Sequence, residues 1–315
     1  MQLIVKASPH QKLATNTPWV MRQVMCALAP AVIASVWLFR ERAVFLILNC
    51  MLTSYLTEIV IFRIRKKTRA SSSLFGGDGS ALLTGLLLAL VLPPAMRWYA
   101  ASIGSVFAVL VSKELFGGLG QNIFNPALMG RAFLMAAYPT MLTTWTNPFT
   151  LDAVTRATPL ALRKFDHVIT PLRDLFLGTV SGSLGETSGI CLLLGGIYLL
   201  IRNIADWRIP LSMFLSTLVV SSFFYFMDPS WGSPLFHIFS GGFLLGAFFM
   251  ATDPVTTPMS KVGRYIFGGG CGILILVIRY FSGYPEGVMF SILFMNALVP
   301  LIDRYTVPKP FGYEK

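Results

Sequence analysis

Apolar residues in this chain form long runs separated by short polar or Gly- and Pro-containing segments. Two runs near the N-terminus, residues 20–39 and 43–62, are each long enough to cross the roughly 30 Å hydrocarbon core of a bilayer as a helix. Eight further apolar runs follow, at residues 80–92, 98–115, 126–138, 188–201, 209–227, 234–250, 265–281 and 287–302. The pattern predicts an all-α integral membrane protein with about ten transmembrane or half-spanning helices.

Two of these runs are too short to cross a bilayer. Residues 80–92 end at Pro93-Pro94, and residues 126–138 begin after Asn125. Asn125 followed by Pro126 is typical of a helix start, with asparagine as the N-cap and proline in the first turn. Both runs therefore predict interrupted helices that end inside the membrane.

The ten runs divide into two sets of five that correspond without a gap. At a constant offset of 161 residues, Gly85 matches Gly246, Pro93 matches Pro254 and Pro139 matches Pro300. An odd number of crossings in each set would make the second copy enter from the opposite face, which predicts two inverted-topology repeats. The expected organisation is a first repeat in residues 1–139, an extramembrane loop in 140–187 and a second repeat in 188–315.

Composition and charge agree with a membrane location. The 315 residues are 55% hydrophobic and 12% charged, with a mean hydropathy of +0.67 and a net charge of +11. The basic residues lie beside apolar runs, as expected for attraction to anionic lipid headgroups, so we expect a bilayer and no nucleic acid as the partner. Most Lys and Arg, Lys113 among them, fall on the side of both termini, which predicts cytoplasmic termini and a periplasmic 140–187 loop in a bacterial inner membrane.

Some features are expected to have structural roles only. The four cysteines lie in apolar runs without metal-ligand spacing, which predicts buried, unreactive thiols. The run Gly268–Gly269–Gly270 predicts close helix packing. The first 20 residues lack the apolar region of a cleaved signal peptide.

The predicted outer loop contains the sequence Asp152-Ala-Val-Thr155-Arg156-Ala157-Thr158-Pro159. A threonine before proline is usually an extended turn or capping residue. This segment also resembles the Asp-x-x-Ser/Thr-Gly-Ala-Thr signature of the family of membrane subunits RnfD and NqrB, in which a flavin transferase joins FMN through its phosphate to the last threonine. Asp152, Thr155, Ala157 and Thr158 match this signature, and Arg156 replaces the glycine.

The resemblance extends over nearly the whole chain. The segments GGDGSALLTGLLLALVLPP (76–94), GQNIFNPALMGRAFLMAAYP (120–139), MATDPVTTP (250–258) and EGVMFSILFMNALVPLID (286–303) are similar to the RnfD pattern. It implies a flavin-carrying subunit of an ion-translocating ferredoxin:NAD oxidoreductase, with FMN on Thr158 and electron transfer coupled to Na⁺ or H⁺ movement. It also implies partner subunits with iron–sulfur and flavin centres, including a second FMN-carrying subunit, and leaves open a second, noncovalent flavin.

Four further polar residues in or beside the apolar runs are candidates for function. Arg131 is expected either to extend to the interface or to meet an anion inside the bundle. Asn125 and Asn296 are expected to cap broken helices or to contact a flavin. Asp253 follows a helix C-terminus, where the dipole disfavours a carboxylate, so we expect it to bind a cation or accept hydrogen bonds.

Two more acidic residues are expected to have ordinary roles, Glu58 pairing with the basic run that begins at Arg63 and Asp78 as an N-cap. Two other functions remain open from the sequence. A redox-inactive channel or transporter for a small solute would use the inverted repeat as its pore, and a scaffold would only hold neighbouring subunits. Of the three, only the flavin subunit requires a covalent flavin on Thr158.

Overall fold

The fold of the chain is known from a computed structural model, which describes residues 16–65, 78–146, 158–186 and 188–308. Over these ranges the secondary structure is entirely helical. The first half contains α1 (Thr17–Phe39), α2 (Glu41–Ile64), α3 (Ser80–Leu90), α4 (Trp98–Val109), the π-helical turn η1 (Leu110–Glu114), α5 (Pro126–Ala137) and α6 (Pro139–Thr143). The connecting region contains α7 (Pro159–Asp166) and α8 (Leu172–Leu177).

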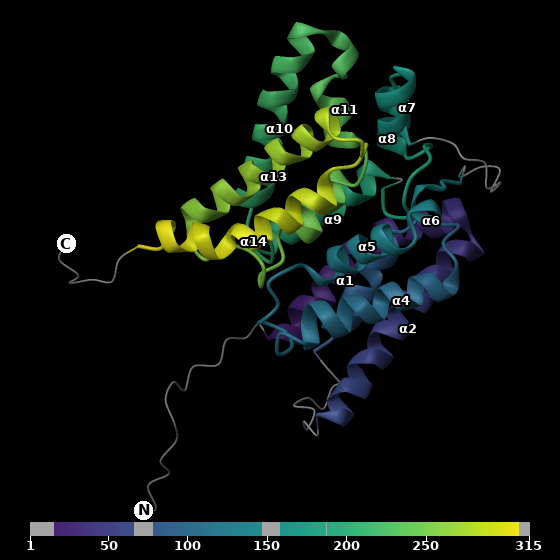
Figure 1. Cartoon of the computed structure of the whole chain (residues 1–315), viewed down its shortest axis with the longest axis vertical. Coiled ribbons are helices and arrows are strands. Elements are labelled where there is room, and N and C mark those ends of the chain that lie inside the picture. Colours follow the sequence, from purple (N-terminus) through teal and green to yellow (C-terminus); the bar gives the residue numbers. More distant parts are fainter. Residues whose placement is uncertain (1–15, 66–77, 147–157, 187, 309–315) are drawn as a thin grey trace, which may run out of the picture.

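The second half contains α9 (Gly189–Ile201), α10 (Arg208–Met227), the 3₁₀ turn η2 (Pro229–Trp231), α11 (Pro234–Phe239), α12 (Phe243–Leu245), the π-helical turn η3 (Gly246–Met250), α13 (Lys261–Phe281) and α14 (Val288–Thr306). Helix α2 packs on α4 as α10 packs on α13, and α4 packs on α5 as α13 packs on α14. The two halves lie side by side in Figure 1, in contact through α1 with α9 and α5 with α14. This correspondence supports the proposed repeat.

The membrane character of the chain is confirmed, whereas the expected number of spans is not. Among the described residues, five helices are long and apolar enough to cross a membrane: α1, α2, α10, α13 and α14. A sixth span is obtained if the pair formed by Pro229–Phe239 and Phe243–Met250, bent by 45°, is counted as one. Helices α3, α5 and α9 are short and apolar. The protein is thus a multi-pass membrane protein.

Two lengths differ from the prediction. The sequence predicts that the last apolar run ends at residue 302, but α14 continues through Pro300 to Thr306. A proline inside a helix removes one backbone hydrogen bond, and here the helix continues past it. The run at 234–250 is predicted as one segment but is broken between α11 and α12, where Gly241 and Gly242 have positive φ angles of 56° and 57°.

The ends of the bundle bring distant segments together. The loop before α13 contacts the end of α14, where Met259 N donates a hydrogen bond to Asp303 Oδ1 (3.0 Å). At the other end of α13, the Lys164 ammonium of α7 donates to the carbonyls of Arg279 (3.0 Å) and Tyr284 (3.2 Å). The α7–α8 region therefore lies at the opposite end of the bundle from the end of α14, and Figure 1 shows α7 and α8 beside α11.

Within the glycine run on α13, Gly268 packs closely against α10 and Gly270 against Met295 of α14, as expected for close helix packing. A Cβ atom on Gly268 would lie 2.4 Å from the carbonyl oxygen of Ile209, whereas a Cβ on Gly269 would meet nothing within 4 Å. The prediction for the cysteines is wrong for Cys26, which is exposed on α1, while Cys50 and Cys271 are buried. Cys26 lies on the apolar outer face of α1, where the surrounding medium would be lipid.

The two glycines provide a matched test of this contact. We expect Gly268→Ala to lower the thermal unfolding temperature in detergent, because overpacking against a backbone atom costs about 1–3 kcal/mol. Gly269→Ala adds a methyl group in open space and should leave that temperature unchanged or raise it, since alanine favours the helix by up to about 1 kcal/mol. Equal effects of the two substitutions would contradict the close approach of α10 and α13.

Candidate functional site

Thr158 lies at the start of α7. Its Oγ1 accepts a hydrogen bond from the backbone N–H of Ala161 (3.3 Å), so the capping role is confirmed. The side chain is only 2% exposed, because Leu160 two residues later packs against Leu175 and Phe236 and draws the helix start inward. An accessible hydroxyl, which covalent attachment requires, is therefore not found in the described conformation.

The remaining residues of the predicted attachment motif, Asp152, Thr155, Arg156 and Ala157, lie outside the described residues. Their arrangement around Thr158 stays a prediction. Thr158 itself borders a narrow cavity of about 10 Å³ that is also lined by Ser181, Glu186 and Gly241. This cavity connects the capping residue to a group of buried charges.

The buried charges at this end of the bundle are Arg131, Glu186 and Glu286. Arg131 Nη2 lies 2.5 Å from Glu286 Oε2, and Arg131 Nη1 lies 3.7 Å from Glu186 Oε1. All three side chains line a second cavity, of about 20 Å³, that also reaches Gly241. Arg131 thus meets anions inside the bundle rather than extending to the surface, and one guanidinium is shared by two carboxylates.

Glu186 lies in the connection between α8 and α9 and borders both cavities. Burial, reinforced by the carboxylate of Glu286, raises the pKa of Glu186 to about 7, although Arg131 opposes this shift. The Oε1 atoms of both glutamates accept no hydrogen bond from a described residue. The cluster can therefore take up a proton near neutral pH.

Arg279 of α13 stabilises the break between α11 and α12. Its guanidinium donates to the carbonyls of His237 (2.5 Å), Ser240 (2.9 Å) and Gly241 (3.1 Å). These carbonyls are left without helical partners where α11 ends, and the buried guanidinium replaces the missing donors. The break that bears Gly241 and Gly242 is thereby fixed beside Glu186.

Two asparagines, Asn125 at the start of α5 and Asn296 in α14, join the two halves of the protein. Asn125 caps α5 as expected, its Oδ1 accepting from the N–H groups of Ala127 (3.1 Å) and Leu128 (3.3 Å). Its Nδ2 donates to the carbonyl of Met250 (3.2 Å), and its backbone N–H donates to Asn296 Oδ1 (3.3 Å). The break before α5 and the end of η3 are thus held by one set of hydrogen bonds.

Asp253 follows η3 and accepts hydrogen bonds within its own loop. Its Oδ1 accepts from Val255 N and its Oδ2 from Thr256 Oγ1, both at 3.3 Å. Asp253, Asn125 and Lys113 line a cavity of about 70 Å³ between the halves. Among the described residues, no group of three or more His, Cys, Asp or Glu side chains is placed to hold a metal ion.

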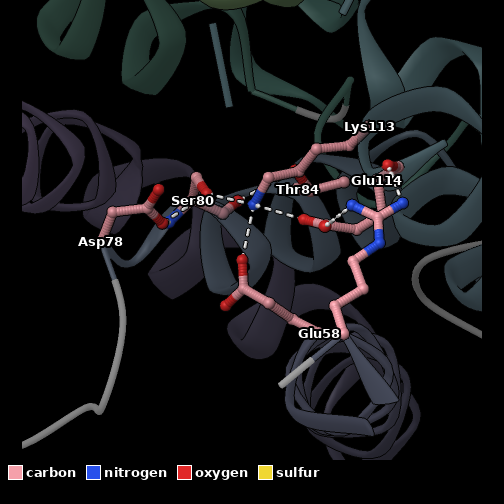
Figure 2. A network of polar contacts seen from close by, with 7 residues as sticks. Glu58, Asp78, Ser80, Thr84, Lys113 and Glu114 are labelled. Carbon is pink, nitrogen blue, oxygen red and sulfur yellow. Dashed lines mark hydrogen bonds and ion pairs between the residues drawn. The ribbon is translucent and has the colours of Figure 1, made fainter. Parts of the chain in front are cut away.

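A second buried charge network adjoins this cavity (Figure 2). Lys113 lies in η1 and is 2% exposed, and its Nζ lies 2.5 Å from both Glu58 Oε1 and Ser80 Oγ. Glu114 lies 3.9 Å from Lys113 Nζ and 3.4 Å from Arg65 Nη1. The five-residue π turn directs both Lys113 and Glu114 into the protein, and single π turns occur frequently at functional sites.

The network changes two sequence-based predictions. Glu58 pairs with Lys113. Of the basic run, the structure describes Arg63, which lies about 140° from Glu58 around α2, and Arg65, which pairs with Glu114. Lys113 itself is buried. Asp78 lies one residue before the expected cap position, which Gly79 occupies, and its Oδ1 accepts from Ser80 N (2.9 Å).

Sequence reasoning did not identify the partners in these clusters. Lys113, Glu186 and Glu286 belong to distant segments, and their proximity depends on tertiary packing. A weak signal was present for Lys113, since a basic residue near the end of a predicted span must either reach the interface or find an anion.

The Glu58–Lys113 pair predicts non-additive effects on stability. Lys113→Met should lower the free energy of unfolding by about 3–5 kcal/mol, because Glu58 would be left as an unpaired buried charge. The double substitution Lys113→Met with Glu58→Gln should recover much of this loss, as measured by thermal unfolding in detergent. Purely additive losses would contradict the pairing.

The raised pKa of Glu186 predicts a pH dependence. Between the unfolded pKa of about 4.5 and the folded pKa of about 7, the folded state binds more protons, so stability should fall as the pH rises through this window. Thermal unfolding at pH 6 and pH 8 should show a smaller difference for Glu186→Gln than for the native chain. Glu41→Gln, at an exposed position on α2, is the control and should leave the difference unchanged.

Comparison with known proteins identifies the family of the chain. Residues 4–312 match the model of the NQR2, RnfD, RnfE family. The chain is 42% identical to the D subunit of the proton-translocating ferredoxin:NAD(+) oxidoreductase complex of Clostridium ljungdahlii, in an alignment that covers 98% of this chain and 96% of the relative.

Other relatives are similar over their whole length. The D subunit of the Na(+)-translocating ferredoxin:NAD(+) oxidoreductase complex of Acetobacterium woodii is 41% identical, over 100% of this chain and 97% of the relative. The D subunit of the ion-translocating oxidoreductase complex of Pseudomonas aeruginosa PAO1 is 38% identical over the same shares. The chain belongs to the NQR2, RnfD, RnfE family and is a membrane subunit of an Rnf-type, multi-subunit oxidoreductase and translocase complex.

Proposed function

We propose that this subunit carries FMN, joined through its phosphate to Thr158, and takes part in electron transfer coupled to Na⁺ or H⁺ translocation. One observation carries the proposal: in a chain of this family, Asp152, Thr155, Ala157 and Thr158 reproduce the attachment signature. The proposal gives the protein a cofactor that supplies the redox chemistry, while the chain supplies position and electrostatic environment.

The position of Thr158 suits a phosphoester. As the N-cap of α7, its oxygen lies where backbone N–H groups are free and the helix dipole favours negative charge. A phosphate on this oxygen could accept hydrogen bonds that the threonine hydroxyl now accepts from Ala161. The attachment point therefore fits the phosphate end of FMN.

The isoalloxazine ring does not fit beside Thr158 in the described conformation. The adjoining cavity measures about 10 Å³, which is about the space that a single water molecule needs. Loading of the flavin must then uncover the hydroxyl by moving the start of α7 away from Leu175 and Phe236. We infer that the transferase acts before this small apolar cluster closes.

The proposal includes the sidedness and partners of the site. The α7–α8 region lies at the opposite end of the bundle from Arg208, Lys261, Arg264 and Arg304, so the positive-inside rule favours cytoplasmic termini and a periplasmic Thr158 loop. We propose a bacterial inner-membrane location, maturation by a flavin transferase, and electron exchange with iron–sulfur and flavin subunits of the complex, one of which carries a second FMN.

A second, noncovalent flavin would lie in the inner cavity between the two halves, whose lining includes Asn125 and Asp253. The transported ion is not distinguished by similarity, because relatives of 42% and 41% identity are named for the proton and for Na⁺, respectively. The names of these relatives favour a redox subunit over a solute channel or a scaffold.

The attachment is tested by in-gel ultraviolet fluorescence of the denatured chain after expression with a flavin transferase. We expect fluorescence from the native chain and none from Thr158→Ala, because the phosphoester needs this hydroxyl. Thr158→Ser retains a hydroxyl and should remain partly fluorescent.

Thr179→Ala is a control that removes a hydroxyl outside the attachment motif and should leave the fluorescence unchanged. A dark native band beside a fluorescent known substrate of the same transferase would contradict the proposal. Fluorescence that persists in Thr158→Ala would place the flavin on another residue.

A further inference from the structure

An open, polar pocket lies at the end of the bundle where α10 and α13 begin. Its volume is about 340 Å³, several times that of the inner cavity. Its polar lining comes from the α9–α10 connection, the loop before α13 and α13 itself: Asn203, Asp206, Arg208, Thr257 and Arg264. The Thr158 region lies at the other end of the bundle, so this pocket is separate from the proposed flavin site.

The pocket has an excess of positive charge. Arg208 Nη1 lies 2.9 Å from Asp206 Oδ2, and Arg264 Nη1 donates to the same oxygen. Two guanidinium groups thus share one carboxylate, which leaves one net positive charge. Burial raises the pKa of Asp206, but the hydrogen bonds and charges of Arg208 and Arg264 outweigh it and hold this pKa below its usual value. Asp206 therefore remains ionised at neutral pH and orients both arginines.

Both arginines keep donors for a ligand. Arg264 uses Nε for the carbonyl of Pro258 (3.0 Å) and Nη1 for Asp206, and no described residue accepts a hydrogen bond from its Nη2. Arg208 uses Nη1 for Asp206 (2.9 Å), which leaves its Nε and Nη2 without an acceptor among the described residues. Planar guanidinium groups with free donors match the oxygens of a phosphate.

Aromatic side chains mark the depth of the pocket in the membrane. Trp207 and Tyr265 are 48% and 40% exposed, and their rings make an edge contact with centroids 6.1 Å apart. The guanidinium of Arg208 lies over Trp207, 5.0 Å from the ring centroid. Exposed Trp and Tyr at the end of membrane helices are typical of the headgroup level of the bilayer. The pocket thus opens where phospholipid phosphates are located.

We propose that this pocket binds a phosphate group carried by an anionic phospholipid headgroup, between the guanidinium groups of Arg208 and Arg264. Basic pockets between membrane helices on the cytoplasmic side are a known mode of lipid recognition. The bound headgroup also contacts the loop that carries Asp253, because Thr252 and Pro254 line both this pocket and the inner cavity. Lipid binding would thereby stabilise the interrupted segment of the second half.

The test uses the full chain purified in nonionic detergent and requires neither flavin nor electron transfer, so its result is independent of the proposed function. Native mass spectrometry counts bound lipids, and thermal unfolding measures stabilisation, after addition of dioleoylphosphatidylglycerol, dioleoylphosphatidylcholine or inorganic phosphate. We expect phosphatidylglycerol to bind and to raise the unfolding temperature, and the other two probes to do neither.

Variants separate a specific site from general charge attraction. Arg208→Gln with Arg264→Gln should weaken phosphatidylglycerol binding about tenfold or more, which is about 1.4 kcal/mol. The control, Arg22→Gln with Arg202→Gln, removes the same charge outside the pocket lining and should leave binding within about twofold of the native chain. Asp206→Asn should strengthen binding, since it removes the competing carboxylate, whereas a purely structural role of these residues predicts only loss.

Three outcomes would overturn the proposal. Equal binding of phosphatidylcholine would show that the charge of the headgroup is irrelevant. Equal weakening in the control variant would indicate diffuse attraction to the surface. Stabilisation by inorganic phosphate as strong as that by the lipid would assign the pocket to a free anion instead of a headgroup.

Discussion

Helices that stop inside an apolar bundle leave backbone groups that water cannot satisfy, and this constraint governs the arrangement of the protein. The break before α5 is satisfied by Asn125, which also bonds to Met250 and Asn296 of the second half. At the break between α11 and α12, the guanidinium of Arg279 donates hydrogen bonds to three backbone carbonyls. Each interruption is therefore also a contact between distant segments.

A similar constraint applies to charge. Arg131 lies within the bundle and is neutralised by two carboxylates. These belong to Glu186, in the α8–α9 connection, and to Glu286, in the loop before α14. Lys113 is neutralised by Glu58 of α2. Because an unpaired buried ion costs several kcal/mol, these pairs specify which segments lie together.

The membrane class, the short helices α3 and α5 and the cap at Asn125 could be predicted from sequence, since each depends on local composition or on one proline. The number of spans could not, because the bend of 45° between the α11 and α12 segments, which decides whether they form one span, has no clear signal in the apolar run. The charge partners were missed for the same reason: Glu58 has a basic run close in sequence, but the helix turns it toward Lys113. The burial of Thr158 depends on Leu160 packing in a cluster of three residues, which no motif records.

In the described parts of the chain, each half contains one π turn, η1 (Leu110–Glu114) in the first and η3 (Gly246–Met250) in the second. Such a turn contains one residue more than an α-helical path over the same height, so everything after it is rotated by about 100° relative to an uninterrupted helix. Deletion of a single residue would restore a regular helix, yet it would turn Lys113 or the Met250 carbonyl away from its partner. At these two sites the length of the chain, in addition to the identity of its residues, preserves the contacts of the bundle.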